Sequence, residues 1–277
     1  MNLKIKRFEK EFHDKQGYHY EQRWVAQPRF KYHYERIACH TKFYLRGKDN
    51  IWLVDVGCGT GRGCLPFADT CAYIIGVDVS RSLLKIFKAK IKSKQLNNIH
   101  LVLCDAENLP LRTKVTDLVT FFGALHHLPN KIRALKETSN ILKTGGLISI
   151  HEPNRESSKL PWIIGSPIIN LLKVLGLKQN KISKTQKSSD ISPYETSLTL
   201  KEAKSMLLNQ DLKILEAKTV WFLGIIPFAM RLPRRTAELY YIVSNATDEP
   251  LEKFGLYGNR AGAVFLIAQK SEKYDEQ

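Results

Sequence analysis

Three glycines at alternate positions, Gly57, Gly59 and Gly61, directly follow a short apolar run. The run covers residues 51–56, is rich in β-branched side chains, and predicts a strand buried on both faces. Glycine tolerates positive φ and has no Cβ, so the backbone can turn sharply and a ligand can lie against it. A strand followed by such a turn and a helix forms a cofactor crevice at the carboxyl end of an open α/β sheet.

The spacing of these glycines excludes two common nucleotide-binding loops. A dinucleotide fingerprint, G-x-G-x-x-G, would need glycine at position 62 or 64, where the chain has Arg62 and Cys64. A G-x-x-x-x-G-K-[ST] phosphate loop does not follow either. The turn is therefore G-x-G-x-G, and it is preceded by the acidic Asp55.

The string Val-Asp-Val-Gly-Cys-Gly-Thr-Gly over residues 54–61 resembles the first motif of the class I S-adenosylmethionine-dependent methyltransferases. Their methyl donor carries an amino acid, a ribose and an adenine but no phosphate, which fits this loop. The resemblance implies S-adenosyl-L-methionine as cofactor, bound by the three glycines and Cys58, with Asp55 shaping the loop. The alternative is an ordinary glycine turn after a buried strand.

An acid, Asp78, ends the second strand, which is predicted over residues 72–77. At this place in a nucleotide-binding sheet an acid accepts hydrogen bonds from both ribose hydroxyls, and the adjacent Val79 is also expected to contact the cofactor. The alternative is that Asp78 and Ser80 cap the helix that begins near residue 81.

A second acid, Asp105, follows the strand predicted over residues 99–103. An acid and a small residue here again resemble the family. The resemblance implies that Asp105 accepts from the exocyclic amine of adenine, while the backbone amide of Ala106 meets a ring nitrogen. The alternative is a turn aspartate.

Two histidines, His126 and His127, follow the strand predicted over residues 116–122. Their string, Gly-Ala-Leu-His-His-Leu-Pro, resembles the fourth motif of the small-molecule methyltransferases, which include quinone-ring, sterol and antibiotic methyltransferases. Either imidazole could act as a general base, because it titrates near working pH. The alternative is that one of them only orients the loop or fills the pocket wall.

His151 and Glu152 follow the fifth strand, predicted over residues 147–150. The Leu-Lys-x-Gly-Gly string before this strand and the Glu-Pro after it are typical of the same family. Both side chains are expected at the acceptor side of the sheet edge. The alternative is a capped strand end.

The elements that must position these residues alternate between strand and helix from residue 51 onward, as in a parallel sheet covered on both faces. We predict an α/β fold: a Rossmann-like, seven-stranded, mostly parallel sheet, with the fourth strand beside the first. Thr199 and Glu202 form a T-x-x-E capping box that opens a helix to about residue 209. Strands follow at 212–220 and 263–268, the last one antiparallel between strands five and six.

The predicted domains are an amino-terminal helical lid, residues 1–50, and a methyltransferase domain, residues 51–277, with inserts at about 155–198 and 221–260. The first segment is basic and aromatic, and the alternative is a helix pair that packs its aromatic residues on the sheet. The inserts hold two apolar stretches beside a lysine-rich loop over residues 173–187. They suggest a lipophilic acceptor pocket or peripheral contact with a membrane monolayer, or else a helical cap with an ordinary core.

The 277-residue chain has a formal net charge of +16, which favours anionic partners such as nucleic acid, an acidic membrane surface or an acidic substrate. Its five cysteines form neither a CxxC pair nor a metal-ligand spacing with histidine. This favours a reducing, cytoplasmic location and predicts no metal site. No apolar run reaches the roughly 18 residues that span a bilayer.

The loop after the fourth strand also narrows the function. The Asn-Pro-Pro-Tyr string of adenine-N6 methyltransferases and the cysteine of cytosine-C5 enzymes are both absent there. We therefore expect methyl transfer to an oxygen, carbon or nitrogen of a small, lipophilic or anionic molecule. One alternative is an RNA (tRNA) methyltransferase that uses the basic surface. The other is a non-catalytic partner protein that binds S-adenosylmethionine.

Overall fold

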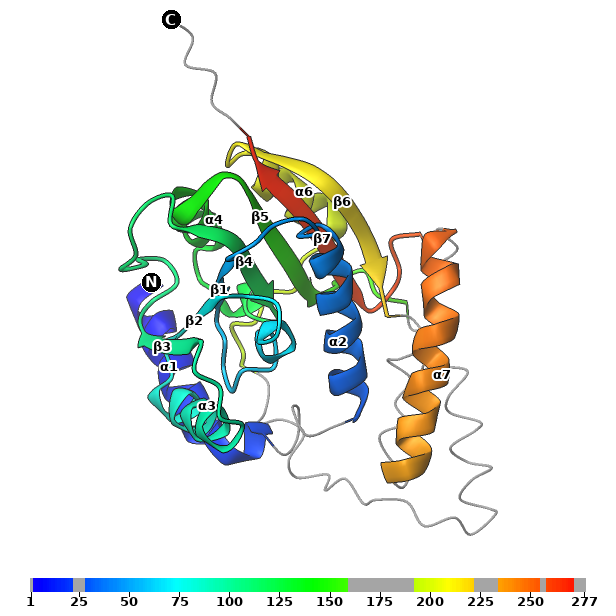
Figure 1. The fold of residues 1–277 in the computed structure, drawn as a ribbon, viewed down its shortest axis with the longest axis horizontal. Coiled ribbons are helices and arrows are strands. Elements are labelled where there is room, and N and C mark those ends of the chain that lie inside the picture. Colours follow the sequence, from blue (N-terminus) through cyan, green and yellow to red (C-terminus); the bar gives the residue numbers. More distant parts are fainter. Residues whose placement is uncertain (1, 22–27, 159–191, 222–233, 255–257, 272–277) are drawn as a thin grey trace, which may run out of the picture.

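The computed structural model describes residues 2–21, 28–158, 192–221, 234–254 and 258–271, and these form a seven-stranded sheet with helices on both faces (Figure 1). The strand order is β3-β2-β1-β4-β5-β7-β6. Strands β1 to β5 pair in parallel, and β7 is antiparallel to both β5 and β6. The predicted fold class is confirmed, as are the places of the fourth and last strands. The strands are β1 (Trp52–Val56), β2 (Tyr73–Asp78), β3 (Ile99–Leu103), β4 (Thr116–Phe122), β5 (Leu142–Pro153), β6 (Leu212–Val220) and β7 (Ala263–Lys270).

Alternate residues of each strand face two separate apolar cores. Leu53 of β1 belongs to the core under α2 (Pro28–Phe43) and α3 (Arg81–Ser93), together with the short 3-10 helix η2 (Leu65–Phe67). Val54 belongs to the core under α4 (Lys131–Ile141) and α6 (Leu200–Leu208). The central strands are therefore buried on both faces, as their continuous apolar sequence predicts.

Strand β5 begins at Leu142, earlier than the predicted start at residue 147. Leu142 pairs with Thr116, the ladder is then interrupted, and it resumes where Leu147 pairs with Leu118. Gly145, at a φ of +73°, allows the backbone to bulge between these two pairs. The Lys-Thr-Gly-Gly segment over residues 143–146 is therefore an irregularity inside a longer strand.

Helix α7 (Arg234–Lys253) lies beside α2 (Figure 1). Its last turn is held from outside, because Glu252 pairs with Arg36 of α2 at 2.9 Å and accepts from the Trp221 backbone amide at 2.8 Å. A local propensity does not reveal such contacts. The apolar stretch and lysine-rich loop predicted within residues 159–191, and most of the second apolar insertion, fall outside the described residues.

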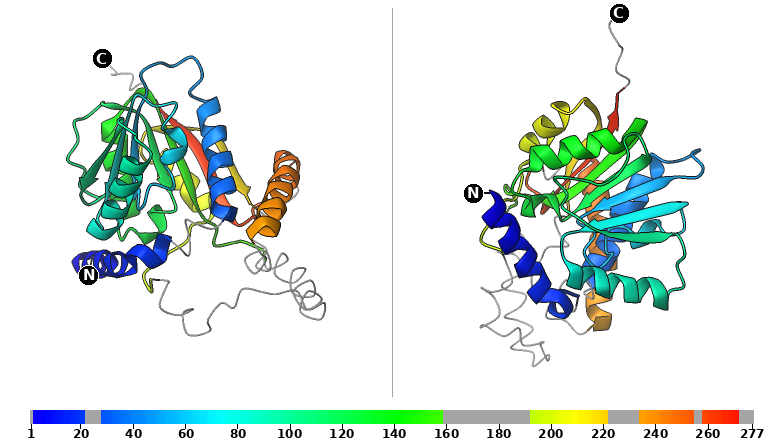
Figure 2. Two further views of the ribbon diagram at one scale, coloured as in Figure 1. Left: turned by 60° about the horizontal axis from the view of Figure 1, so that its bottom comes forward. Right: turned by 90° about the vertical axis from the view of Figure 1, so that its left-hand side faces the viewer.

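Helix α1 (Asn2–Tyr20) crosses one end of the sheet, below the strands in the left view of Figure 2. Its helical geometry is interrupted at Gly17, at a φ of 26°. Helix α2 instead packs Phe30 and Tyr34 into the apolar core. The predicted helical character of residues 1–50 agrees with these two helices, and the role of this segment as a lid stays a prediction.

Candidate active site

The glycine turn directly follows β1, and backbone hydrogen bonds to the end of β2 hold it in place. The backbone amides of Gly57 and Cys58 donate to the Val77 carbonyl at 2.8 and 3.0 Å. Gly57 has a φ of +71°, and a Cβ there would lie 2.4 Å from Cβ of Ala124. Only glycine fits this position, because any side chain would collide with the neighbouring loop.

The Asp78 carboxylate connects the glycine turn to the start of α3. Its Oδ2 accepts from the Gly59 amide and its Oδ1 from the Ser80 amide, each at 2.8 Å. The helix itself is capped by Ser80, whose Oγ accepts from the Leu83 amide. Burial raises the pKa of Asp78, and the amide donors of Ser80 and Gly59 oppose that shift. Asp78 thus holds the turn in shape while it also borders the pocket beside the turn.

This first pocket is open to solvent, and about 840 Å³ of space lies within it and at its mouth. Six of the predicted cofactor residues line it: Gly57, Gly59, Asp78, Val79, Asp105 and Ala106. The structure brings together the ends of β1, β2 and β3 because parallel strands present their carboxyl ends at one edge.

Three other predicted cofactor residues, Asp55, Cys58 and Gly61, do not line the pocket. Asp55 is 1% exposed, and its Oδ1 accepts from the Thr120 hydroxyl at 2.6 Å. Burial raises the pKa of Asp55 to about 7, although the hydroxyl of Thr120 opposes that shift. A Cβ on Gly61 would lie 2.2 Å from the Phe87 ring. These residues shape the loop from behind.

Helix α1 adds pocket residues that the sequence reasoning missed. Lys6 donates to Asp105 and also pairs with Glu107, with both Nζ–O distances at 2.6 Å. Further along the helix, Asp14 accepts from the Ser80 hydroxyl at 2.7 Å and from the Ser82 amide at 3.0 Å. The acids at positions 105 and 107 are visible in the sequence, but their lysine partner is not, because it lies about a hundred residues away.

The histidine loop, which contains the 3-10 helix η3 (Leu125–His127), is organised by Glu152. One carboxylate oxygen accepts from the amides of Ala124 and Leu125 at 2.8 and 2.7 Å. The other accepts from the His126 amide at 3.2 Å and lies 2.6 Å from Nδ1 of the same residue. Glu152 is fully buried and lines neither the first pocket nor the second, adjoining pocket that contains His126. It therefore positions the loop and does not face an acceptor.

His127 points in the other direction, toward α1. Its Nδ1 lies 3.4 Å from Oε2 of Glu9 and 3.5 Å from Oε1 of Glu195. Burial lowers the pKa of His127 well below its usual value. Burial would raise the pKa of Glu9, but His127, His13 and Ser192 together lower it to about 2. His127 is therefore a neutral imidazole beside an ionised carboxylate.

A second pocket of about 850 Å³ lies on the other side of His127. It is lined mainly by aromatic and imidazole side chains, among them Phe12, Phe30, Tyr34, His126, His151 and Trp221. His13, Tyr20, Gly123 and His127 line both this pocket and the first one, so the two spaces share a wall.

His151 is one of the residues in the wall of the second pocket. Its Nε2 lies 2.7 Å from Nε2 of His33, so one ring donates and the other accepts. Burial, followed by the positive charges of Arg62 and Arg36, lowers the pKa of His151 to about 3. His151 is therefore neutral, and its ring takes part in a hydrogen bond within the pocket wall.

Arg62 is a cation inside the second pocket, surrounded by rings. Its guanidinium carbon lies 4.4 Å from the ring centre of Tyr34, 5.0 Å from that of Phe30 and 5.9 Å from that of Tyr20. Within the described residues it makes these cation–π contacts but neither a hydrogen bond nor an ion pair with a carboxylate. The sequence showed Arg62 only as the residue that breaks a dinucleotide motif.

The arrangement of strands and the glycine turn define a class I methyltransferase fold, and comparison with known proteins agrees. Residues 54–150 match the family described as "Methyltransferase domain". A demethylmenaquinone methyltransferase of Staphylococcus haemolyticus is 38% identical over 98 residues, which cover 34% of this chain and 40% of that protein. Residues 54–150 are therefore similar to a methyltransferase domain, and the chain spans less than half of this curated relative.

Two further similarities extend over nearly the whole chain. An uncharacterized protein of Methanocaldococcus jannaschii is 26% identical over 269 residues, covering 94% of this chain and 90% of that one. A solved SAM-dependent methyltransferase of Thermotoga maritima is 18% identical with a TM-score of 0.59, covering 94% and 99% of the two chains. The structural likeness supports the fold. Among the described residues, no helix is long and apolar enough to cross a membrane.

Proposed function

We propose that this protein transfers the methyl group of S-adenosyl-L-methionine to a small molecule held in the second pocket. The proposal rests on the wall that the two pockets share. The first pocket is lined by the residues of the cofactor motifs and the second mainly by aromatic and imidazole side chains. Both are bordered by His13, Tyr20, Gly123 and His127. A methyl donor and an acceptor in adjoining spaces meet the main demand of this reaction, because in-line displacement depends on placement and desolvation.

The first pocket fits the cofactor by its donor set. Gly59 is open to it, since a Cβ there would have no neighbour closer than 3.9 Å. The Asp78 carboxylate has further lone pairs beyond those used by two amides, and these suit ribose hydroxyls. Asp105 suits the adenine amine, which would share this carboxylate with Lys6. Bound there, S-adenosylmethionine supplies an electrophilic methyl group on a sulfonium.

The second pocket supports an acceptor that is both aromatic or lipophilic and negatively charged. Its wall offers flat rings for stacking, and the guanidinium of Arg62 lies among them without an ion pair to any described residue. A half-buried guanidinium with no carboxylate in ion-pair contact among the described residues is a ready partner for an acceptor carboxylate, phosphate or phenolate oxygen. The proposed small-molecule acceptor is therefore an anionic compound.

Of the two histidines, His126 suits proton transfer. When its Nδ1–H donates to Glu152, its Nε2 keeps a lone pair, and His126 borders the second pocket. A carboxylate on the far side of the ring also stabilises the imidazolium that forms when Nε2 accepts a proton. We assign general-base catalysis to His126 if the acceptor is a hydroxyl or a carbon acid.

Calorimetry with S-adenosylmethionine tests the proposal first. Wild type should bind one equivalent, and Asp78→Asn should bind about 10- to 150-fold more weakly, the loss of one hydrogen bond to a charged acceptor. The matched control is Asp69→Asn, because Asp69 is exposed and lies outside both pockets. Absence of binding to folded wild type would overturn the proposal.

Labelled methyl transfer then separates the proposal from its two alternatives. Anionic aromatic compounds should accept the label, and Arg62→Met should raise the acceptor KM while cofactor affinity stays within about twofold. RNA methylation rests on the net charge of +16 and would instead show affinity that falls steeply with salt. A binding protein without catalysis would bind the cofactor but transfer no label to any acceptor.

A further inference from the structure

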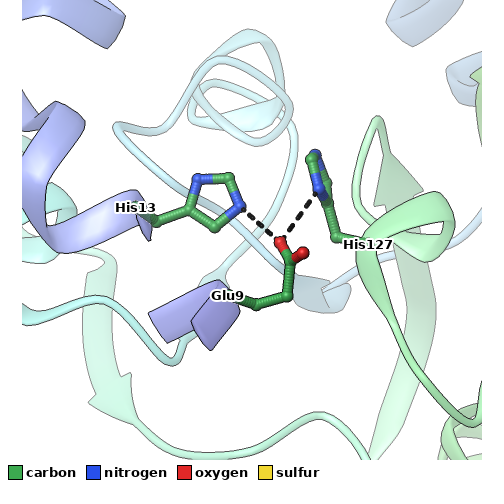
Figure 3. A group of neighbouring side chains, drawn as sticks. All are labelled: Glu9, His13 and His127. Carbon is green, nitrogen blue, oxygen red and sulfur yellow. Dashed lines mark ion pairs between the residues drawn. The ribbon is translucent and has the colours of Figure 1, made fainter. Parts of the chain in front are cut away.

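Two residues of α1 and one residue of the histidine loop converge on a single point in the shared wall. Glu9 and His13 are four residues apart and therefore lie on the same face of the helix. His127 approaches from η3, so that the Glu9 carboxylate lies between the two imidazole rings (Figure 3). The two segments that supply these side chains, α1 and η3, are distant in the sequence.

The separations within this cluster are those of ligands around a common ion. Oε2 of Glu9 lies 3.5 Å from Nε2 of His13 and 3.4 Å from Nδ1 of His127. A tetrahedral ion with ligands at about 2.1 Å holds them about 3.4 Å apart. Direct hydrogen bonds would be shorter, at about 2.7–3.2 Å. The three ligand atoms all lie within 4.8 Å of one another.

The polar atoms at the centre of the cluster lack the partners that burial demands. Glu9 is 5% exposed, and neither its Oε2 nor Nδ1 of His127 has a hydrogen-bond partner among the described residues. The other oxygen of Glu9 is held by the Ser192 hydroxyl, which fixes the orientation of the carboxylate. A buried, oriented carboxylate oxygen without a donor is costly unless something else binds it.

We propose that Glu9, His13 and His127 bind a divalent transition-metal ion, with Zn²⁺ as the reference ion, at the wall between the two pockets. Two imidazoles and one carboxylate suit zinc and leave at least one coordination position for another ligand. A further carboxylate, that of Glu195, has its Oε1 3.5 Å from Nδ1 of His127.

The position of the ion defines what it can do. His13 and His127 line both pockets, so the ion would lie in the wall between the space assigned to the cofactor and the space assigned to the acceptor. The ion would hold an oxygen or nitrogen donor atom of the acceptor beside the methyl group. This consequence rests on the proposed function, whereas metal binding itself does not.

The decisive experiment is titration of chelator-treated full-length protein with Zn²⁺ by calorimetry, and with Co²⁺ by visible absorption, in the absence of S-adenosylmethionine. Wild type should bind one ion and give the intense d–d bands of a four- or five-coordinate cobalt site. Glu9→Gln and His13→Gln should each weaken Zn²⁺ binding by about 100-fold or more and lose those bands.

The matched control is Glu11→Gln, because Glu11 lies two residues further along α1, is exposed and pairs with Arg7. It should bind Zn²⁺ as wild type does. Circular dichroism confirms that each variant is folded, and having two ligand variants guards against the failure of one. Equal Zn²⁺ affinity in wild type and in a folded ligand variant would show a plain histidine–carboxylate cluster and overturn the proposal. Zn²⁺ binding without S-adenosylmethionine binding would instead refute the proposed function alone.

Discussion

Replacing Glu152 with glutamine tests how the histidine loop is organised. The carboxylate accepts from three backbone amides and faces Nδ1 of His126. Glutamine keeps one oxygen for the amides of Ala124 and Leu125, but places an NH₂ group where the second oxygen stood. That group can donate to Nδ1 of His126, which forces the ring into the tautomer that carries its proton on Nε2.

The magnitude follows from the bonds that change. The His126 amide loses a charged acceptor in a fully buried place, which costs about 1.5–3 kcal/mol. A domain of this size loses about 2–4 °C of Tm per kcal/mol, so we expect a Tm lower by about 3–12 °C. In the other tautomer Nε2 cannot accept a proton, so methyl transfer that needs a base should fall by about 10²–10⁴-fold.

The direct assay is nitrogen NMR of the His126 ring, which does not depend on the acceptor. Wild type should show a protonated Nδ1 and Glu152→Gln a protonated Nε2. Calorimetry should show unchanged affinity for S-adenosylmethionine, because Glu152 does not line the first pocket. The matched control is Glu137→Gln, since Glu137 accepts from a single backbone amide, that of Leu109. If the variant keeps the wild-type tautomer and Tm, the reasoning is wrong.

Three further perturbations follow from the same structure. Burial raises the pKa of Asp55 from 3.8 to about 7, so the folded state binds more protons than the unfolded state between these pH values. The free energy of unfolding should therefore fall as pH rises from about 4 to about 7. Urea unfolding of Asp55→Asn should show a flatter dependence of that free energy on pH. Gly57→Ala should lower Tm and weaken cofactor binding, because it adds about 1–2 kcal/mol of left-handed backbone strain and a clash with Ala124. Gly47 has a φ of +76° and lies in open space, so Gly47→Ala should show the strain alone. Equal losses of Tm in the two variants would contradict the clash. Thr199→Ala removes the capping box of α6 and should cost about 0.5–2 kcal/mol in denaturant unfolding, so an unchanged midpoint would count against that cap.

The sequence by itself determined the sheet and the first half of the site. The residues at the strand ends, such as Gly57, Asp78 and Asp105, were predictable because parallel strands with buried sequences bring their carboxyl ends to one edge. The capping boundaries of α3 and α6 were also local, since each depends on a side chain within three residues of the amide it accepts from.

Only the tertiary structure decided what faces these strand ends. Lys6, Glu9 and His13 reach the site because α1 packs across the sheet edge, and their spacing along that helix does not name partners about a hundred residues away. Glu152 was predicted to lie at the acceptor side, but its carboxylate holds the backbone of a neighbouring loop. Arg62 lies in an aromatic pocket that three separate segments build. Such contacts depend on how whole elements dock, and a local pattern of residues carries no record of that.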